Sequence, residues 1–85
     1  MTLRRSRGEA RPRVDARAEA LGRRLRVLRT SAGLDPTELA AAAGLDPATY
    51  RRAEAGDPAT LTYLDLVALA DALAVPADSL LADLA

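Results

Sequence analysis

The side chains best suited to binding in this sequence are its arginines, because a guanidinium carries a permanent charge and several fixed hydrogen-bond donors. Two of them, Arg51 and Arg52, are adjacent, and Thr49 lies just before them. On a helix such residues can contact the phosphates of a nucleic acid, and an arginine can pair with the edge of a guanine. The alternative is that the three residues form an exposed polar helix face that binds nothing.

Charge is divided unevenly along the chain although its total is zero. Residues 1–33 contain ten arginines and three acidic residues, a net of +7, whereas residues 34–85 contain two arginines and nine acidic residues, a net of −7. The basic first half favours an anionic partner such as nucleic acid, and the zero total by itself argues against one.

The residue types that most enzyme chemistry needs are missing. The chain has no histidine, cysteine or lysine, no glycine-rich phosphate loop, and no acidic cluster with metal-ligand spacing. We therefore expect no enzyme activity, no metal site and no cofactor. No apolar run approaches the roughly 20 residues that span a bilayer, and no apolar segment follows the basic N-terminus. We expect a cytoplasmic protein without a membrane partner.

A repeated tetrapeptide indicates the elements that position these arginines. Gly-Leu-Asp-Pro occurs at residues 33–36 and again at residues 44–47. Glycine readily ends a helix in the left-handed conformation, aspartate caps the next helix, and proline fits its first turn. The repeat predicts two short helices, about Pro36–Ala43 and Pro47–Ala55, joined by a tight turn. Such a pair is a helix-turn-helix, here at about residues 36–55.

Three further helices follow from hydrophobic periodicity and capping residues. The first covers about Asp15–Ser31, the fourth begins near Thr62 and ends near Ala74, and the last runs from Pro76 to about Leu84. Their apolar stripes contain Leu21, Leu25, Leu28, Leu66, Leu69, Leu73, Leu80, Leu81 and Leu84. We expect one all-α domain of five helices over residues 15–85. Residues 1–14 form a basic arm, which either follows DNA phosphates or is a solubilising tail.

Capping pairs strengthen two of these helix starts. Glu38 lies three residues after Asp35, and Asp65 lies three residues after Thr62, so each pair predicts a capping box. In the helix that carries the arginines, we expect Tyr50 to pack in the core rather than to stack on a base.

The segments LGRRLRVLRTSAGLDPTELAAAAGLDPATYRRAEAG and LDLVALADALAVPADSLL resemble the phage-repressor/Cro (XRE) helix-turn-helix domain over about residues 21–84. The resemblance implies a five-helix, lambda-repressor-like domain that regulates transcription, commonly as a repressor. It also implies that the helix at about residues 47–55 lies in the major groove, and that a homodimer binds double-stranded DNA at a palindromic operator. Arg29 and Glu54 occupy positions that commonly pair in this family.

The resemblance also implies a set of DNA contacts. Arg52 is the candidate for guanine recognition, Arg51 for a phosphate contact and Thr49 for a hydroxyl contact, while Ala48 can touch only a thymine methyl group. Further candidate contacts are the arginines of the first helix and of the arm. These are Arg23, Arg29, Arg4, Arg5 and Arg7.

The sequence departs from the family pattern where relatives often contact DNA. Pro36, Pro47 and Ala48 stand at positions that are often polar or basic, and Asp57 lies in a loop that often carries a cation. These residues and the acidic second half favour a second hypothesis. In it, the fold serves as a protein-interaction module, antitoxin-like or co-regulatory, with weak or no DNA binding.

A dimer, if the chain forms one, is expected to use the last helix or the N-terminal segment. The candidate interface residues are Leu80, Leu81 and Leu84. The alternative for these leucines is packing within the single chain, which some of them must do.

Overall fold

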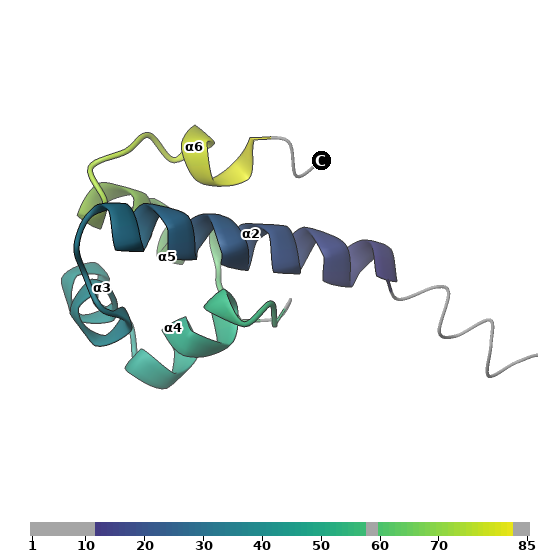
Figure 1. Ribbon diagram of the computed structural model, residues 1–85, viewed down its shortest axis with the longest axis horizontal. Coiled ribbons are helices and arrows are strands. Elements are labelled where there is room, and N and C mark those ends of the chain that lie inside the picture. Colours follow the sequence, from purple (N-terminus) through teal and green to yellow (C-terminus); the bar gives the residue numbers. More distant parts are fainter. Residues whose placement is uncertain (1–11, 58–59, 83–85) are drawn as a thin grey trace, which may run out of the picture.

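Five α-helices make up most of the chain that the computed structural model describes, which is residues 12–57 and 60–82. In chain order they are α2 (Pro12–Ser31), α3 (Pro36–Ala43), α4 (Pro47–Glu54), α5 (Tyr63–Ala72) and α6 (Asp78–Leu81) (Figure 1). No strand occurs in these two ranges, and the predicted all-α class is confirmed. None of the helices described combines the length and apolar character that a bilayer crossing requires.

The predicted helix boundaries differ from the observed ones mainly at the two ends of the domain. Helix α2 begins at Pro12, three residues before the expected start. Helix α6 begins only at Asp78, because the turn that opens at Pro76 is closed by bonds between residues three apart. In these bonds Ser79 N donates to Pro76 O (2.9 Å) and Leu80 N donates to Ala77 O (3.0 Å).

Side-chain caps fix where the interior helices start. Both predicted capping boxes are present, one at the start of α3 and one at the start of α5. In the second, Thr62 Oγ1 accepts from Asp65 N at 3.1 Å, and Thr62 N donates to Asp65 Oδ2 at 3.0 Å. Each cap satisfies backbone N–H groups that have no partner inside the helix. These starts are therefore specified locally by the sequence.

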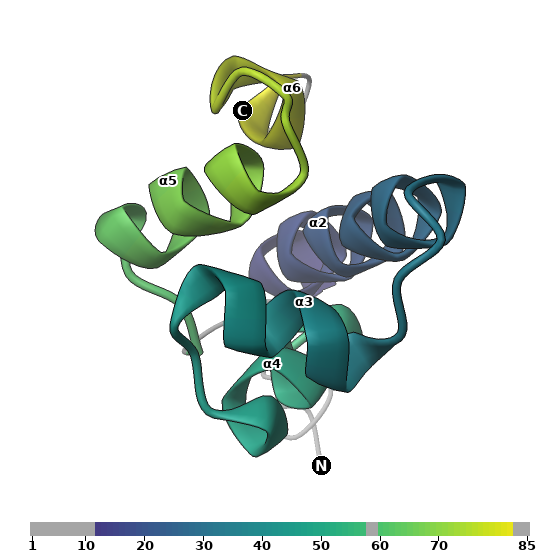
Figure 2. The ribbon, with the colours of Figure 1, turned by 90° about the vertical axis from the view of Figure 1, so that its left-hand side faces the viewer.

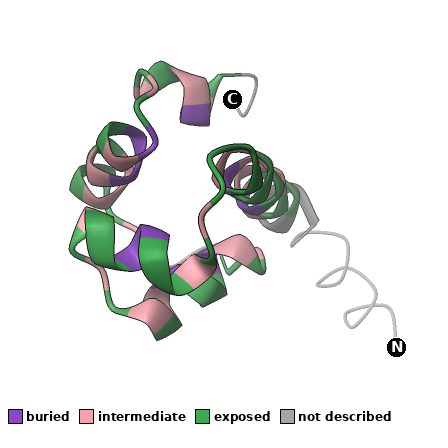
Figure 3. Ribbon diagram, turned by 60° about the vertical axis from the view of Figure 1, so that its left-hand side comes forward, coloured by how far each residue is buried: buried purple, intermediate pink, exposed green. Residues whose placement is uncertain are grey.

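The core takes one fully buried large side chain from every helix. These are Leu25 from α2, Leu39 from α3, Tyr50 from α4, Leu69 from α5 and Leu80 from α6, each 0% exposed. Figure 3 shows the buried residues turned toward the space between the helices. Burying one such side chain stabilises a fold by roughly 1.5–3 kcal/mol, so each helix is held by at least one contact of that size.

The burial of Leu80 corrects one expectation. Leu80 was a candidate for a dimer interface, yet it lies in the core of a single chain and presents no surface to a second copy. Leu81 is partly buried and packs against the same core, and Leu84 lies outside the described residues.

The long helix α2 runs across the molecule, with α6 along one side and α4 on the other (Figure 1). It packs against both of them, while α3 packs against α4 and α5, and α5 also packs against α6. Figure 2 shows α3 and α4 together on the side of the molecule away from α6. The helix-turn-helix therefore forms one face of the domain, and the outer side of α4 is left uncovered.

Arg24 secures α6 to α2. Its Nη1 donates to Ser79 O (3.4 Å) and Leu80 O (3.2 Å), and also to Ala82 O. A cation at the C-terminal end of a helix is stabilising, because the last carbonyl groups have no partner inside the helix and carry partial negative charge. This arginine has an intramolecular role that the sequence did not reveal.

Candidate nucleic-acid interface

The turn between α3 and α4 is built from the second Gly-Leu-Asp-Pro. Gly44 ends α3 in the left-handed conformation (φ 73°), and Leu45 N donates back to Ala40 O at 2.8 Å. A side chain at φ 73° would be strained, so glycine suits this position. Asp46 then caps α4 and Pro47 occupies its first turn, as the sequence predicted.

Carboxylates occupy the N-terminal ends of both helices of this motif. Asp46 Oδ2 accepts from Ala48 N (3.0 Å) and Thr49 N (3.3 Å) at the start of α4. Asp35 Oδ1 accepts from Glu38 N (2.8 Å), and Glu38 Oε1 accepts from Asp35 N (2.8 Å), at the start of α3. Free N–H groups at a helix start can bind a phosphate. Here several of those donors are already taken by the protein's own acids.

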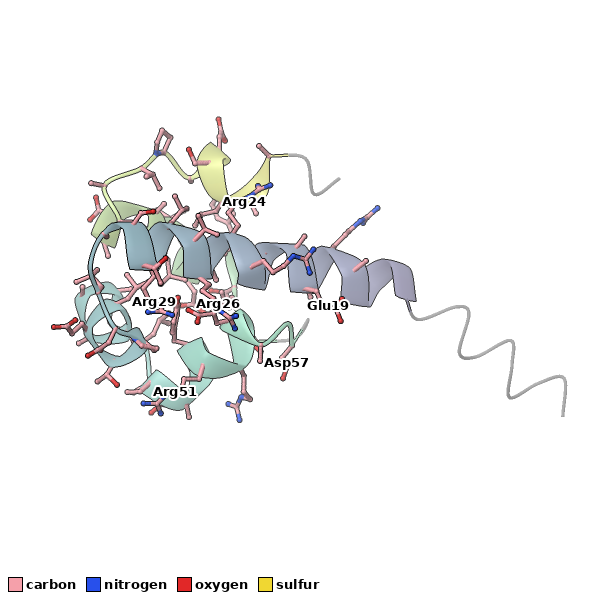
Figure 4. All side chains as sticks on the ribbon, in the orientation of Figure 1. Glu19, Arg24, Arg26, Arg29, Arg51 and Asp57 are labelled. Atoms are coloured by element: carbon pink, nitrogen blue, oxygen red, sulfur yellow. The ribbon has the colours of Figure 1, made fainter. Side chains whose placement is uncertain are left out.

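The outer side of α4 carries two exposed arginines. Arg51 and Arg52 are exposed, Ala48 is exposed, and Thr49 is partly buried. The Nη2 of Arg51 donates to Thr37 Oγ1 of α3 at 3.1 Å, which links the two helices of the motif (Figure 4). The guanidinium of Arg52 has no hydrogen bond or ion pair with any residue in the described ranges. Both arginines are thus presented at the surface, and neither is tied into the core.

The opposite side of α4 is anchored to α2 by an ion pair. Arg29 Nε donates to Glu54 Oε2 (2.8 Å) and Arg29 Nη2 donates to Glu54 Oε1 (2.9 Å), while Nη1 donates to Leu34 O (2.8 Å). The two side chains are only 11% and 9% exposed. The structure therefore brings together the pair that the resemblance implied.

This arrangement gives Arg29 a structural role within the protein, and its contact with DNA stays a prediction. All three guanidinium nitrogens of Arg29 are donating within the protein, and the side chain is nearly buried. Nη1 and Nη2 each carry a second N–H, so a phosphate that reaches Arg29 can use only those two donors unless it displaces Glu54 or the Leu34 carbonyl. Breaking such a buried pair is costly.

Two further groups bind the same carboxylate. The hydroxyl of Tyr50 donates to Glu54 Oε2 at 2.5 Å, and Arg26 Nε donates to Glu54 Oε1 at 3.4 Å from a side chain that is 62% exposed. The i, i+4 spacing of Tyr50 and Glu54 on one helix is a signal that sequence reasoning missed. Tyr50 is buried as predicted, and its hydroxyl is satisfied by Glu54.

The ionisation of this cluster follows from these contacts. Burial acts to raise the pKa of Glu54, but the hydrogen bonds from Arg29 and Tyr50 outweigh it and hold the pKa below its ordinary value. The hydrogen bond to Glu54 raises the pKa of Arg29. Burial, followed by the hydrogen bond to Glu54, raises the pKa of Tyr50. Glu54 is therefore ionised and Tyr50 and Arg29 are protonated at neutral pH.

Gly22 allows α2 and the end of α4 to approach each other. It is buried, and a Cβ at this position would lie 2.5 Å from Glu54 O and 2.8 Å from Ala53 O. The structure shows that no larger residue fits here without moving the backbone of α4.

The other predicted contacts are spread over the chain. Arg23 is exposed on α2. Asp57, which departs from the family pattern and is not a predicted contact, is exposed just after α4. Arg4, Arg5 and Arg7 lie outside the described residues.

Two short helices joined by a tight left-handed turn, with the second helix held from behind and presenting arginines outward, define a helix-turn-helix domain. The chain belongs to the helix-turn-helix domain family, whose model matches residues 20–84. The match is consistent with the phage-repressor/Cro (XRE) resemblance, and it covers all five helices except the start of α2. Neither the curated proteins nor the solved structures include a significant match to this chain. Helix-turn-helix domains are in general DNA-binding modules of regulators.

Proposed function

We propose that this chain is a sequence-specific transcriptional regulator of the phage-repressor/Cro type, with α4 lying in the major groove of its operator. The observation that carries this proposal is the contrast between the two sides of α4. Tyr50 and Ala53 are buried and Glu54 is locked to α2, whereas Arg51 and Arg52 are exposed on the outer side. A helix fixed from behind presents its outer side chains in a defined orientation, as base recognition requires.

The two arginines have different roles in this proposal. Arg52, whose guanidinium has no partner among the described residues, pairs with the O6 and N7 atoms of a guanine. Arg51 is tethered to Thr37 and contacts a phosphate with its remaining donors. Thr49 adds a hydroxyl contact, and Ala48 packs against a thymine methyl group.

Several acids oppose the approach of phosphates to this surface. Asp35 and Asp46 lie at the two helix starts of the motif, and Asp57 follows α4. DNA affinity must then come from the arginines, including Arg23 on α2. The logarithm of the affinity should fall linearly with the logarithm of the salt concentration, with a slope of about −0.9 for each phosphate that an arginine neutralises. The contacts of Arg4, Arg5 and Arg7 stay predictions.

The operator in this proposal is palindromic and is bound by a homodimer. Each copy places one α4 in the major groove of one half-site. A DNA-bound regulator also implies that the protein resides with the chromosome in the cytoplasm. Its role is binding rather than catalysis.

A second function is favoured by the occupied N-terminus of α4. The carboxylate of Asp46 takes two donors that could serve a phosphate, and Pro47 has no N–H to offer. An interface poor in free N–H donors suits a protein partner, so an antitoxin-like or co-regulatory module is the alternative.

Selection of binding sites from random duplex DNA at physiological salt tests the proposal. Wild-type protein should enrich one motif, and the double variant Arg51→Ala/Arg52→Ala should lose that enrichment while keeping its helical content. The matched control is Arg17→Ala, which removes an exposed charge on α2 far from α4 in sequence. The absence of any enriched motif, at physiological or at low salt, would overturn the proposal and favour the protein-interaction module.

A further inference from the structure

The helices α2, α3, α4 and α5 all end in the same kind of turn. At each end, two successive backbone N–H groups donate back to carbonyl groups three and five residues earlier. After α5, Ala74 N donates to Asp71 O at 3.0 Å. Val75 N donates to Ala70 O, also at 3.0 Å. Such a turn needs one residue in the left-handed conformation, and after α2, α3 and α4 that residue is a glycine. The three glycines are Gly33 (φ 75°), Gly44 (φ 73°) and Gly56 (φ 97°).

The turn after α5 differs, because its left-handed residue is Ala74 (φ 60°). In this conformation the Cβ of an L-residue lies too close to the backbone, so alanine is strained where glycine is not. Ala74 is exposed, and burial of its methyl group therefore does little to offset the strain. Pro76 follows two positions later and favours extended backbone at Val75. The strained turn of the four is thus the one that leads into α6, and an extended Ala74 would relieve it.

The segment beyond this turn is held in place by other helices. Helix α6 packs on α2 and α5, and no side chain caps its start. Leu80 is 0% exposed, and Val75 and Leu81 are partly buried against the same core. Arg24 Nη1 donates to carbonyl groups at the end of α6, among them Leu80 O at 3.2 Å. Figure 1 shows the chain leaving α5 in a loop before it turns into α6. A second chain that offers the same groups on α2 and α5 could hold this segment equally well.

We propose that two copies of this chain exchange residues 75–82, so that α6 of each copy packs on α2 and α5 of the other. The two partners are identical, and the site that receives α6 therefore contains the same Arg24 and the same apolar core. The contacts of Leu80 and Arg24 are re-formed between the copies, and only the turn at Ala74 changes. This inference rests on the contacts of α6 and does not depend on DNA binding.

The turn at Ala74 sets the balance between one chain and two. Opening the turn relieves the strain at Ala74 but loses the two hydrogen bonds of the turn, whose groups then bond to water. Joining two copies also costs translational and rotational freedom. The single chain is therefore favoured at low protein concentration, and the exchanged dimer is favoured at high concentration. Conversion between the two forms is slow, because Leu80 must leave the core before α6 can move.

Refolding of the full chain over a range of concentrations, followed by sedimentation, tests the proposal. Wild type should give a dimer whose fraction rises with the concentration during refolding and falls only slowly after dilution. Ala74→Gly relieves the strain in the single chain and should lower the association constant about 10-fold or more, since two copies are affected. Ala55→Gly is the matched control, because Ala55 is also exposed at a helix end but has an ordinary φ of −80°. It should leave association unchanged.

Cross-linking between two different variants identifies the exchanged element. The chain has no cysteine, so an introduced thiol is the only one in each variant. Arg24→Cys places a thiol on α2 and Ser79→Cys places one on α6, at positions that the Arg24 side chain connects in the single chain (3.4 Å from Nη1 to Ser79 O). Refolded together at high concentration, the two variants should be joined into a covalent dimer by a short bismaleimide. Refolded separately and then mixed in the cold, they should not. Circular dichroism checks that both variants are folded.

Three results would overturn the proposal. They are a wild type that is monomeric at every concentration, equal association of Ala74→Gly and wild type, and a dimer that gives no cross-link between the two thiol variants. The last result would mean that the copies associate through another surface. A monomeric wild type that still enriches a DNA motif would sink the exchange alone. An exchanged dimer that enriches no motif would overturn the DNA-binding function and leave the exchange intact.

Discussion

Arg29 and Glu54 join the last turn of α2 to the last residue of α4 through two hydrogen bonds of 2.8 and 2.9 Å. A bidentate pair of this kind fixes direction as well as distance, because both groups are planar. The third donor of Arg29 reaches Leu34 O, just before α3, so the same guanidinium also holds the entry to the helix-turn-helix. The orientation of α4 relative to α2 is therefore set largely by one arginine.

Removing the carboxylate should destabilise the fold strongly. Glu54→Ala leaves the Arg29 guanidinium and the Tyr50 hydroxyl without their partner in a region that is about nine-tenths buried. We expect a loss of about 3 kcal/mol in the free energy of unfolding, measured by denaturant titration. Arg29→Lys should lose part of this stability, because an ammonium cannot form the bidentate pair. Arg23→Ala, an exposed site on the same helix, should change stability by less than about 0.5 kcal/mol. Equal stability of Glu54→Ala and wild type would show that the pair is incidental.

The same carboxylate predicts acid sensitivity. The folded state holds the pKa of Glu54 below its ordinary value of 4.5, so its stabilising effect is present above that value. The effect is lost as pH falls through the lower pKa of the folded state, because the proton binds the unfolded chain more tightly. Unfolding free energies measured from about pH 6 to about pH 2 should fall more steeply for wild type than for Glu54→Gln. Parallel curves for the two proteins would rule out this origin of the acid sensitivity.

Features that depend on residues near one another in sequence could be predicted, and features set by packing could not. The two capping boxes and the turn at Gly44 follow from residues a few positions apart, so the bounds of α3 and α4 were predicted within one residue. Leu80 shows the limit of prediction from local sequence patterns. A leucine in a short terminal helix suits the core and a dimer interface equally well, and only the packing of α6 on α2 and α5 places it in the core.

The same distinction between local sequence patterns and packing applies to the residues of the candidate site. The outward direction of Arg51 and Arg52 follows from helical periodicity once Tyr50 is assigned to the core. The bond from Arg51 to Thr37 joins residues fourteen positions apart, and no local pattern predicts it. Arg24 illustrates the same limit, because its role depends on carbonyl groups more than fifty residues away.

Gly22→Ala should destabilise the domain although alanine is the better helix former. The added Cβ would lie 2.5 Å from Glu54 O, so α2 and α4 would have to separate. We expect a loss of roughly 1–3 kcal/mol, the range for overpacking, against a gain of up to about 1 kcal/mol in helix propensity. Thermal unfolding measures the balance. Val27→Ala, at a site of α2 that is 61% exposed, serves as the control for propensity alone. A net stabilisation by Gly22→Ala would refute the close approach.

Arg52→Ala and Arg51→Ala should differ in how they weaken DNA binding. If Arg52 pairs with a guanine, its loss should cost roughly 1–3 kcal/mol on the selected site and relax the preference at one base pair. If Arg51 contacts a phosphate, its loss should weaken binding to all sequences alike and reduce the salt slope by about 1. Titrations of matched and mismatched duplexes at several salt concentrations distinguish the two effects. Equal losses on every duplex for both variants would remove Arg52 from base recognition.

Asp46→Asn should raise DNA affinity without loss of stability. Asparagine caps a helix about as well as aspartate, so the bonds to Ala48 N and Thr49 N can be kept. The substitution removes a negative charge from the end of α4 that approaches the DNA, where each carboxylate opposes the binding of phosphates. Asp78→Asn removes the same charge from the exposed start of α6, on the side of α2 away from α4, and controls for the change in net charge. Because Asp46 holds the start of α4 in place, a gain confined to Asp46→Asn at equal unfolding free energy would identify that end of the helix as facing the phosphates. Equal gains from both variants would mean that only net charge matters, and that the N-terminus of α4 does not approach the DNA.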